Sequence, residues 1–384
     1  MQAMRPTYVP PRAPYRFLGV FRFLLASLVM VQHAGVLLPR GISDRLAPLE
    51  LGGMAVFAFF IVSGFVIAEA AAAFYASRPG AFLANRLLRL VPTYLLALFV
   101  SALILKAAFP TFVPAPNEAP ITPERFAVAT VLANSLALFP FWRAVQTHAG
   151  VPEILEQGWA LRVELLFYFA MAISIGLSVL ARISLVQVLT AAGTALFLLL
   201  SLVGHYADGT ALENAPYFIL GVAFYYALSR QEEWWLPGAF CATALTFVAA
   251  HLAGRAPVFG LISQPRDRWG ELLIVALLTA SFAILACVSE RPTRPWLIAK
   301  RIDRAFGDLT YPLYLLHWAV LIAAKTWLPH ESATTTLVAF AAAYLVALGA
   351  ALAVEQPIAR LRSVVRRPRS RSGRLATQGH PAAP

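Results

Sequence analysis

The chain has 384 residues, of which 59% are hydrophobic and only 13% are charged, and its formal net charge is +12. A soluble domain keeps about a quarter of its residues charged, so this composition excludes a soluble globular protein. Apolar runs of about 20 residues, each long enough to cross the hydrocarbon core of a bilayer, recur along the chain. The sequence therefore predicts an all-α, polytopic integral membrane protein with lipid as its solvent.

The positive charge is concentrated in short loops and in the segment 359–384, which holds seven arginines. In a soluble protein such charge would suggest nucleic acid, but here it follows the rule that basic loops stay on the cytoplasmic side. A basic tail also favours anionic lipid headgroups. We therefore expect no nucleic-acid partner and three parts: a cytoplasmic N-terminal tail at 1–16, a membrane domain at 17–358, and a basic, disordered cytoplasmic tail at 359–384.

Ten candidate membrane helices follow in chain order. They cover residues 17–38, 51–75, 86–108, 158–180, 184–205, 211–229, 234–253, 270–289, 308–327 and 333–354. The first run is longer than the apolar core of a signal peptide, so we expect it to be retained. With both termini cytoplasmic, the inner segments hold 20 Lys and Arg residues and the outer loops hold 7. This asymmetry favours about ten spans with both termini inside.

The longest gap between these helices, 109–157, is rich in proline and is expected to be an outer loop. Its segment 126–142 is apolar enough for a re-entrant or interfacial helix. Counting it as an eleventh span would place the polybasic tail outside, against the charge rule. We therefore expect it not to cross the membrane.

Ionisable residues inside these helices are the candidate functional groups, because charges in hydrocarbon are costly. In the first helix Arg22 and His33 are eleven positions apart, which places both side chains on one face about 16 Å apart along the axis. An alternative is that Arg22 reaches to the inner headgroups while His33 binds a neighbouring carbonyl. In the second helix, the pair Ser63-Gly64 is either a packing notch or a place where a ligand approaches the backbone.

The third helix carries Arg86 and Arg89 on one face of its cytoplasmic end. Ordinary inner-leaflet arginines look the same, but a phosphate-bearing ligand would also need two guanidinium groups there. In the fourth helix Glu164 needs a partner, and Arg162 lies on the wrong face to be one, so His33 is a plausible partner. The ninth helix places His317 near the middle of the membrane, beyond the depth expected of an interfacial aromatic belt.

Three further residues were considered. Glu355 ends the last helix and can pair with inner arginines. Cys241 and Cys287 fall in apolar runs without any CxxC or metal-ligand spacing, so we assign them no role and expect no metal site.

Taken in order, these segments resemble acyltransferase family 3, the polytopic bacterial membrane proteins that O-acylate surface and exported glycans. The resemblance covers most of residues 17–358. It is carried by Arg22 and His33 with ten residues between them; Phe59, Phe60, Ser63, Gly64 and Phe65 of an FFxxSGF motif; Arg86 and Arg89 of an RxxR pair; Trp159, Leu161 and Glu164 of a WSLxxE-type motif; Tyr311, Tyr314, Leu315, His317 and Trp318 of a SYxxYLxHW-type motif; and Glu355 and Pro357 of a terminal ErP.

The chain departs from the family pattern at three places. Gly19 stands near the position of the acidic residue that usually precedes the first-helix arginine, so Arg22 is expected to lack its usual nearby counterion. Ala160 replaces the serine of WSL, and Gln356 replaces the arginine of ErP.

The resemblance implies transfer of an acyl group, with acetyl expected, from acyl-CoA to a hydroxyl of a cell-surface or exported saccharide, free or lipid-linked, at the bacterial inner membrane. It implies that His33 is catalytic and that Arg86 and Arg89 bind acyl-CoA, with Arg22 as a further candidate and no bound cofactor. Glu164 is expected to orient His33 or bind the sugar. The remaining candidates for substrate binding or oxyanion stabilisation are Ser63, Trp159, Tyr311, Tyr314 and His317.

Two other functions remain open at this point. A transporter or flippase of a glycan or lipid-linked substrate would also carry charges in the membrane, but inverted repeats and broken helices at matching positions are not evident. A non-catalytic assembly partner would tolerate replacement of His33.

Overall fold

The computed structural model describes residues 16–108, 127–203, 214–228, 294–329 and 332–366, together with a short helical stretch between 277 and 285. Within this part of the chain the regular elements are all helices, which agrees with the predicted all-α class. The predicted helix 234–253, most of 270–289, both cysteines and most of the two tails lie outside the described residues.

The α-helices follow the predicted order. They are α1 Gly19–His33, α2 Arg40–Leu46, α3 Leu51–Phe74, α4 Pro79–Ala108, α5 Val128–Ser135, α6 Pro140–His148, α7 Trp159–Ala181, α8 Leu185–Val203, α9 Ala215–Leu228, α12 Arg294–Trp327, α13 Ala333–Ala350 and α14 Gln356–Arg366. A 3₁₀ turn at Glu156–Gly158 precedes α7, and a π-helical turn at Ala351–Glu355 joins α13 to α14.

Five helical segments of the described chain are long and apolar enough to cross a bilayer. They are Gly19–Val36, Arg40–Phe74, Pro79–Ala108, Glu156–Ala181 and Ala333–Arg366. This supports a membrane protein with several spans, whereas the total of ten and the side on which the termini lie stay predictions.

Two helices begin well before their predicted starts. α4 begins at Pro79 instead of residue 86, and α12 begins at Arg294 instead of residue 308. The residues added to α12 include arginines and a lysine, which lower hydropathy but are good helix formers, whereas those added to α4 are uncharged and begin with Pro79, which suits a first helical turn. Arg86 and Arg89 consequently lie inside α4, not at its first turn.

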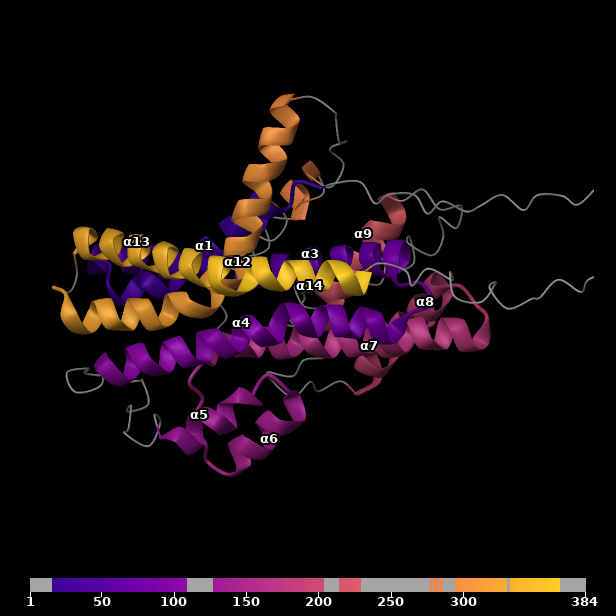
Figure 1. The fold of residues 1–384 in the computed structure, drawn as a ribbon, viewed down its shortest axis with the longest axis horizontal. Helices are drawn as coiled ribbons and strands as arrows, with labels where there is room; N and C mark the ends of the chain where they lie inside the picture. Colours follow the sequence, from indigo (N-terminus) through magenta and orange to yellow (C-terminus); the bar gives the residue numbers. More distant parts are fainter. Residues whose placement is uncertain are drawn as a thin grey trace, which may run out of the picture.

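The predicted outer-loop segment 126–142 is not one helix. It forms α5 and α6, of eight and nine residues, which are too short to span a bilayer. Asn134 fixes this hairpin, because its backbone carbonyl accepts a hydrogen bond from the hydroxyl of Tyr94 at 2.8 Å and its side-chain oxygen accepts one from the backbone N–H of Ile154. Figure 1 shows α5 and α6 lying to one side of the long helices.

Close helix crossings hold the bundle together at small residues. A Cβ on Gly64 of α3 would lie 2.1 Å from the carbonyl oxygen of Phe218 in α9, and one on Gly221 would lie 1.9 Å from that of Ile61. The packing interpretation of Gly64 is therefore confirmed, while its neighbour Ser63 faces a cavity.

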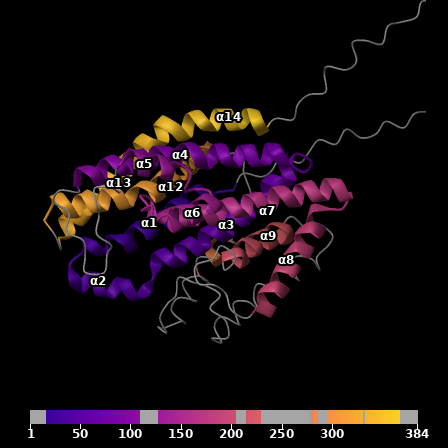
Figure 2. The same cartoon turned by 90° about the horizontal axis from the view of Figure 1, so that it is seen from below.

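Helices α1, α3, α4, α7 and α12 form one packed group within the bundle. α1 packs against α12 and α3, and α4 packs against α7 and α12. The first part of α12 stands out of the bundle in Figure 1, and Pro312 lies inside this helix, where a proline removes a hydrogen bond and bends the chain. α14 returns along α4, as both Figure 1 and Figure 2 show.

Candidate active site

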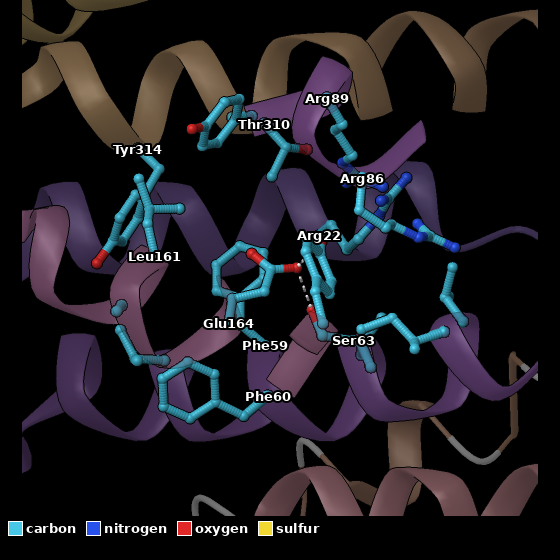
Figure 3. A pocket seen from close by; sticks show the side chains of 17 residues that line it. Arg22, Phe59, Phe60, Ser63, Arg86, Arg89, Leu161, Glu164, Thr310 and Tyr314 are labelled. Carbon is cyan, nitrogen blue, oxygen red and sulfur yellow. Dashed lines mark hydrogen bonds between the residues drawn. The ribbon is translucent and has the colours of Figure 1, made fainter. Parts of the chain in front are cut away.

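The first cavity of interest, here called the arginine cavity, lies among α1, α3, α4, α7 and α12 and holds about 700 Å³ not filled by protein atoms. Its polar wall consists of Arg22, Arg86, Arg89, Ser63, Glu164, Tyr168, Thr310, Tyr311 and Tyr314. Phe59, Phe60 and aliphatic side chains complete it. Figure 3 shows the three arginines gathered on one side and Glu164 near the centre.

The arginines concentrate positive charge in a buried place. Arg86 is only 4% exposed, and its Nε atom has no hydrogen-bond partner in the described structure. Its guanidinium lies over the rings of Phe82 and Tyr168, at 5.4 Å and 5.7 Å from their centroids. Because a buried donor without a partner is costly, this end of the cavity is suited to an anion with several oxygen acceptors.

The expectation that Arg22 lacks a nearby counterion is not met, because α12 supplies negative charge. Asp303 and Asp308 of that helix act on Arg22 electrostatically. Asp303 also accepts a hydrogen bond from the backbone N–H of Val20 at 2.9 Å. A Cβ on Gly19 would lie 1.8 Å from the Asp303 carbonyl oxygen, so the glycine makes room for α12. Asp303 lies between the predicted helices 270–289 and 308–327, so the sequence pattern does not indicate that it faces Arg22.

Glu164 has different partners from the one predicted. Its Oε1 accepts hydrogen bonds from the Ser63 hydroxyl at 3.1 Å and from the Tyr168 hydroxyl at 2.6 Å. His33 was the expected partner, and the structure does not make that contact. Arg162 pairs with Glu153, in agreement with its placement on another face. Tyr168 was not singled out, although its position four residues after Glu164 places both on one face.

A second cavity, here called the histidine cavity, holds about 1210 Å³ and is lined by His33 of α1. Its other polar and aromatic wall residues are Gln32, Glu50, Glu156, Gln157, Trp159, Tyr314 and Trp318. The His33 and Trp318 rings meet edge to face, with centroids 5.3 Å apart. The imidazole therefore points into the protein, as the same-face argument predicted for Arg22 and His33.

His33 and His317 form a hydrogen-bonded pair. His33 Nδ1 lies 2.8 Å from His317 Nε2, and His317 Nδ1 lies 3.0 Å from the carbonyl oxygen of Leu313. A carbonyl oxygen can only accept, so His317 Nδ1 carries a proton and its Nε2 accepts when the ring is neutral. His33 must then donate from Nδ1, which leaves its Nε2 as the basic atom.

The two cavities adjoin, because Val56 and Tyr314 lie in the walls of both. Four helices pass from one to the other in a consistent direction. Residue numbers rise toward the histidine cavity along α1 and α12 and fall along α3 and α7. Arg22 and His33 thus lie on one helix in two adjoining cavities, and this pair of cavities is called the route below.

The remaining predicted residues fall on or beside this route. Tyr311 donates to the Leu90 carbonyl at 3.0 Å, and Tyr314 donates to the Gln157 carbonyl at 3.0 Å. Trp159 lines the histidine cavity. Glu355 is buried and accepts a hydrogen bond from Thr93 at 2.7 Å, behind the arginines. Gln157, Glu50 and Glu156 were missed, since they precede helices instead of lying in apolar runs.

Comparison with known proteins shows the family to which the chain belongs. The sequence model of a family described as "Acyltransferase domain" matches residues 15–355. The chain is also 27% identical over 325 residues to the exopolysaccharide production protein ExoZ of Rhizobium meliloti (strain 1021), covering 81% of this chain and 90% of that protein. No solved structure matches the chain significantly.

Proposed function

Because the chain belongs to acyltransferase family 3, we propose that this enzyme moves an acetyl group from acetyl-CoA, through the bundle, to a hydroxyl of a cell-surface or exported saccharide. The family match and its extent support the acyltransferase activity, and the relative named for exopolysaccharide production supports a saccharide acceptor. The observation that supports this proposal most directly is that His33, whose basic nitrogen is defined by its hydrogen bond, lines a cavity that adjoins a cluster of buried arginines.

The arginine cavity is proposed to hold the donor. Phosphate oxygens of coenzyme A are the multivalent acceptors that Arg22, Arg86 and Arg89 require, and the unpartnered Nε of Arg86 is one donor for them. The thin pantetheine arm would pass Phe59 and Tyr314 toward His33. The rise of α1 separates Arg22 from His33 by roughly 16 Å along the axis, which an extended arm of this kind spans.

The reaction follows from the tautomer of His33. Nε2 takes the proton of the acceptor hydroxyl while the oxygen forms a bond to the thioester carbonyl carbon. As the tetrahedral intermediate collapses, the carbon–sulfur bond breaks and the leaving sulfur takes the proton from His33. The products are an O-acyl ester and free coenzyme A. Tyr314 lies in the wall shared by the two cavities, and it would become a donor to the oxyanion by exchanging its present hydrogen bond to the Gln157 carbonyl for one to the substrate.

Glu164 and Ser63 are assigned to the donor side of the route. Their hydrogen bond and the Tyr168 hydroxyl hold the carboxylate beside the arginines. A carboxylate there balances part of the buried positive charge and orients the guanidinium groups. We propose that this, instead of contact with His33, is how Glu164 acts.

A test of the proposal replaces His33 with alanine in the producing bacterium. We expect ester-linked acetyl on surface saccharides to fall to the level of a deletion strain, with the protein still present in the membrane. His148→Ala is the matched control, because His148 is exposed on α6 away from both cavities. Unchanged acetylation in the His33→Ala strain would contradict the mechanism and favour the transporter or assembly-partner alternatives.

A further inference from the structure

We propose that the histidine cavity is the acceptor site and that it selects an uncharged saccharide ring over an acidic one. This inference rests on the proposed acyl transfer and names the chemistry of its second substrate. It is carried by the wall of the cavity: aromatic faces, side-chain amides and two glutamates around the imidazole of His33.

The aromatic residues provide apolar surfaces for a sugar ring. Trp159, Tyr314 and Trp318 all line the cavity, and Trp318 lies edge to face with His33 at a centroid distance of 5.3 Å. Pockets that bind small molecules pair aromatic surface with a few placed polar groups. A ring packed on Trp318 would bring its hydroxyls next to the basic nitrogen of His33.

The polar residues are suited to hydroxyl groups, which both donate and accept. The amides of Gln32 and Gln157 offer donors as well as acceptors, whereas the carboxylates of Glu50 and Glu156 only accept. Gln157 is 5% exposed; its side-chain amide donates to the Leu315 carbonyl, and its backbone carbonyl accepts from the Tyr314 hydroxyl. It is therefore held in place before any ligand binds, which reduces the entropy lost on binding.

Glu50 is held at the cavity by its backbone. It adopts a left-handed conformation, with φ of 47°, directly before the first residue of α3. Such a conformation is costly for a residue with a side chain and tends to persist where a site requires it. A Cβ on Gly53, three residues later, would meet the Glu50 carboxylate at 3.8 Å, so the backbone is open at Gly53, whereas a Cβ on Gly52 would lie 2.8 Å from Gln32 Cβ.

The charge of the wall decides the class of saccharide. Among the described residues that line the histidine cavity, Glu50 and Glu156 carry negative charge and none is lysine or arginine. The arginine cavity has the opposite charge. A uronate or a phosphorylated sugar would bring its negative charge next to these two carboxylates in a wall whose described residues include no lysine or arginine, whereas an uncharged ring would meet no such repulsion.

The test measures transfer from radiolabelled acetyl-CoA to p-nitrophenyl glycosides by the full-length protein in lipid nanodiscs. Glucoside is compared with glucuronide, and galactoside with galacturonide, because each pair differs at a single carbon. We expect the uncharged member to be acetylated roughly tenfold faster at low salt. The double change Glu50→Gln with Glu156→Gln should narrow that ratio, whereas Asp44→Asn, on exposed α2, should leave it unchanged.

Glycoside binding is measured separately by saturation-transfer NMR without any acyl donor. Trp318→Ala should remove the signal of the uncharged glycosides, and Trp318→Phe should retain part of it. Trp142→Ala is the control, since Trp142 is exposed on α6.

The outcomes separate the two proposals. Binding that follows Trp318 and the glutamates, without acyl transfer to any glycoside, contradicts the acyltransferase mechanism and leaves the histidine cavity as a saccharide-binding site. Transfer that is insensitive to both sets of variants, equal transfer to uncharged and acidic glycosides, or no glycoside binding by the unaltered protein overturns the acceptor-site assignment.

Discussion

The hydrogen-bonded pair His33–His317 determines which ring nitrogen would act as the base in the proposed reaction. His317 is fully buried, and its two ring nitrogens face the Leu313 carbonyl and His33. In the proposed mechanism it is therefore a positioning residue: it would fix which nitrogen of His33 is basic and accept the Nδ1–H bond when His33 takes a proton. The oxyanion role considered for His317 from sequence is less suitable, because neither nitrogen is free to reach substrate.

This assignment predicts a split between two variants of His317. His317→Ala should lower kcat by roughly 10²-fold with little change in KM for the acyl donor, because general-base catalysis contributes about that much. His317→Gln should recover part of kcat, since its amide oxygen can accept the His33 Nδ1–H bond. Steady-state kinetics in nanodiscs measures both, with thermal stability recorded in parallel. Equal kcat for His317→Ala and the unaltered protein would contradict the positioning role.

At the same scale, sequence identified the polar residues better than their contacts. The helical repeat alone predicts that Arg22 and His33 share one face, because both lie on one helix. Glu164 was recognised as needing a partner, but the Ser63 hydroxyl that binds it lies 101 residues away. That contact depends on how α3 and α7 pack, which no local pattern encodes.

At the scale of helices, hydropathy predicted the apolar parts of α4 and α12 but not the residues that extend both helices at their N-terminal ends. Because α12 begins early, Asp303 lies in this helix and acts on Arg22. Because α4 begins early, Arg86 lies inside that helix and not in its first turn. α5 ends at Ser135 and Pro140 begins α6, because proline suits the first position of a helix. A scan for membrane spans misses the start of α12 because Lys300, Arg301 and Asp303 lower its hydropathy, whereas the start of α4 is uncharged.

The contact between α3 and α9 yields a prediction on stability. Gly64→Ala adds a methyl group that would meet the Phe218 carbonyl oxygen at 2.1 Å, so the helices must separate, at a cost of about 1–3 kcal/mol. Gly176→Ala in α7 is the matched control, because a Cβ there meets nothing within 4 Å and alanine favours the helix. Thermal unfolding of the purified protein should show a lower Tm for Gly64→Ala only. Equal Tm values for the two variants would disagree with the packing.

For the whole molecule, the order of the two cavities along four helices would give the proposed transfer a direction. α1 and α12 run from the arginine cavity to the histidine cavity, and α3 and α7 run back. If the N-terminus is cytoplasmic, as the distribution of basic residues predicts, the arginines open toward cytosolic acyl-CoA and His33 lies toward the outer face. An acceptor outside the cell can then be acylated without crossing the membrane.

That orientation depends on a topology which fusion proteins can test. Alkaline phosphatase, which is active only outside the cytoplasm, should be active when joined after Gly150 and inactive when joined after Arg182 or at the C-terminus. Gly150 follows α6 in the predicted outer loop, and Arg182 follows α7 on the inner side. The same chain with a C-terminal fluorescent protein should fluoresce, since that reporter folds in the cytoplasm. The reverse pattern would turn the arginine cavity toward the outside, where no acyl-CoA is supplied, and the route would then run in the wrong direction for the proposed reaction.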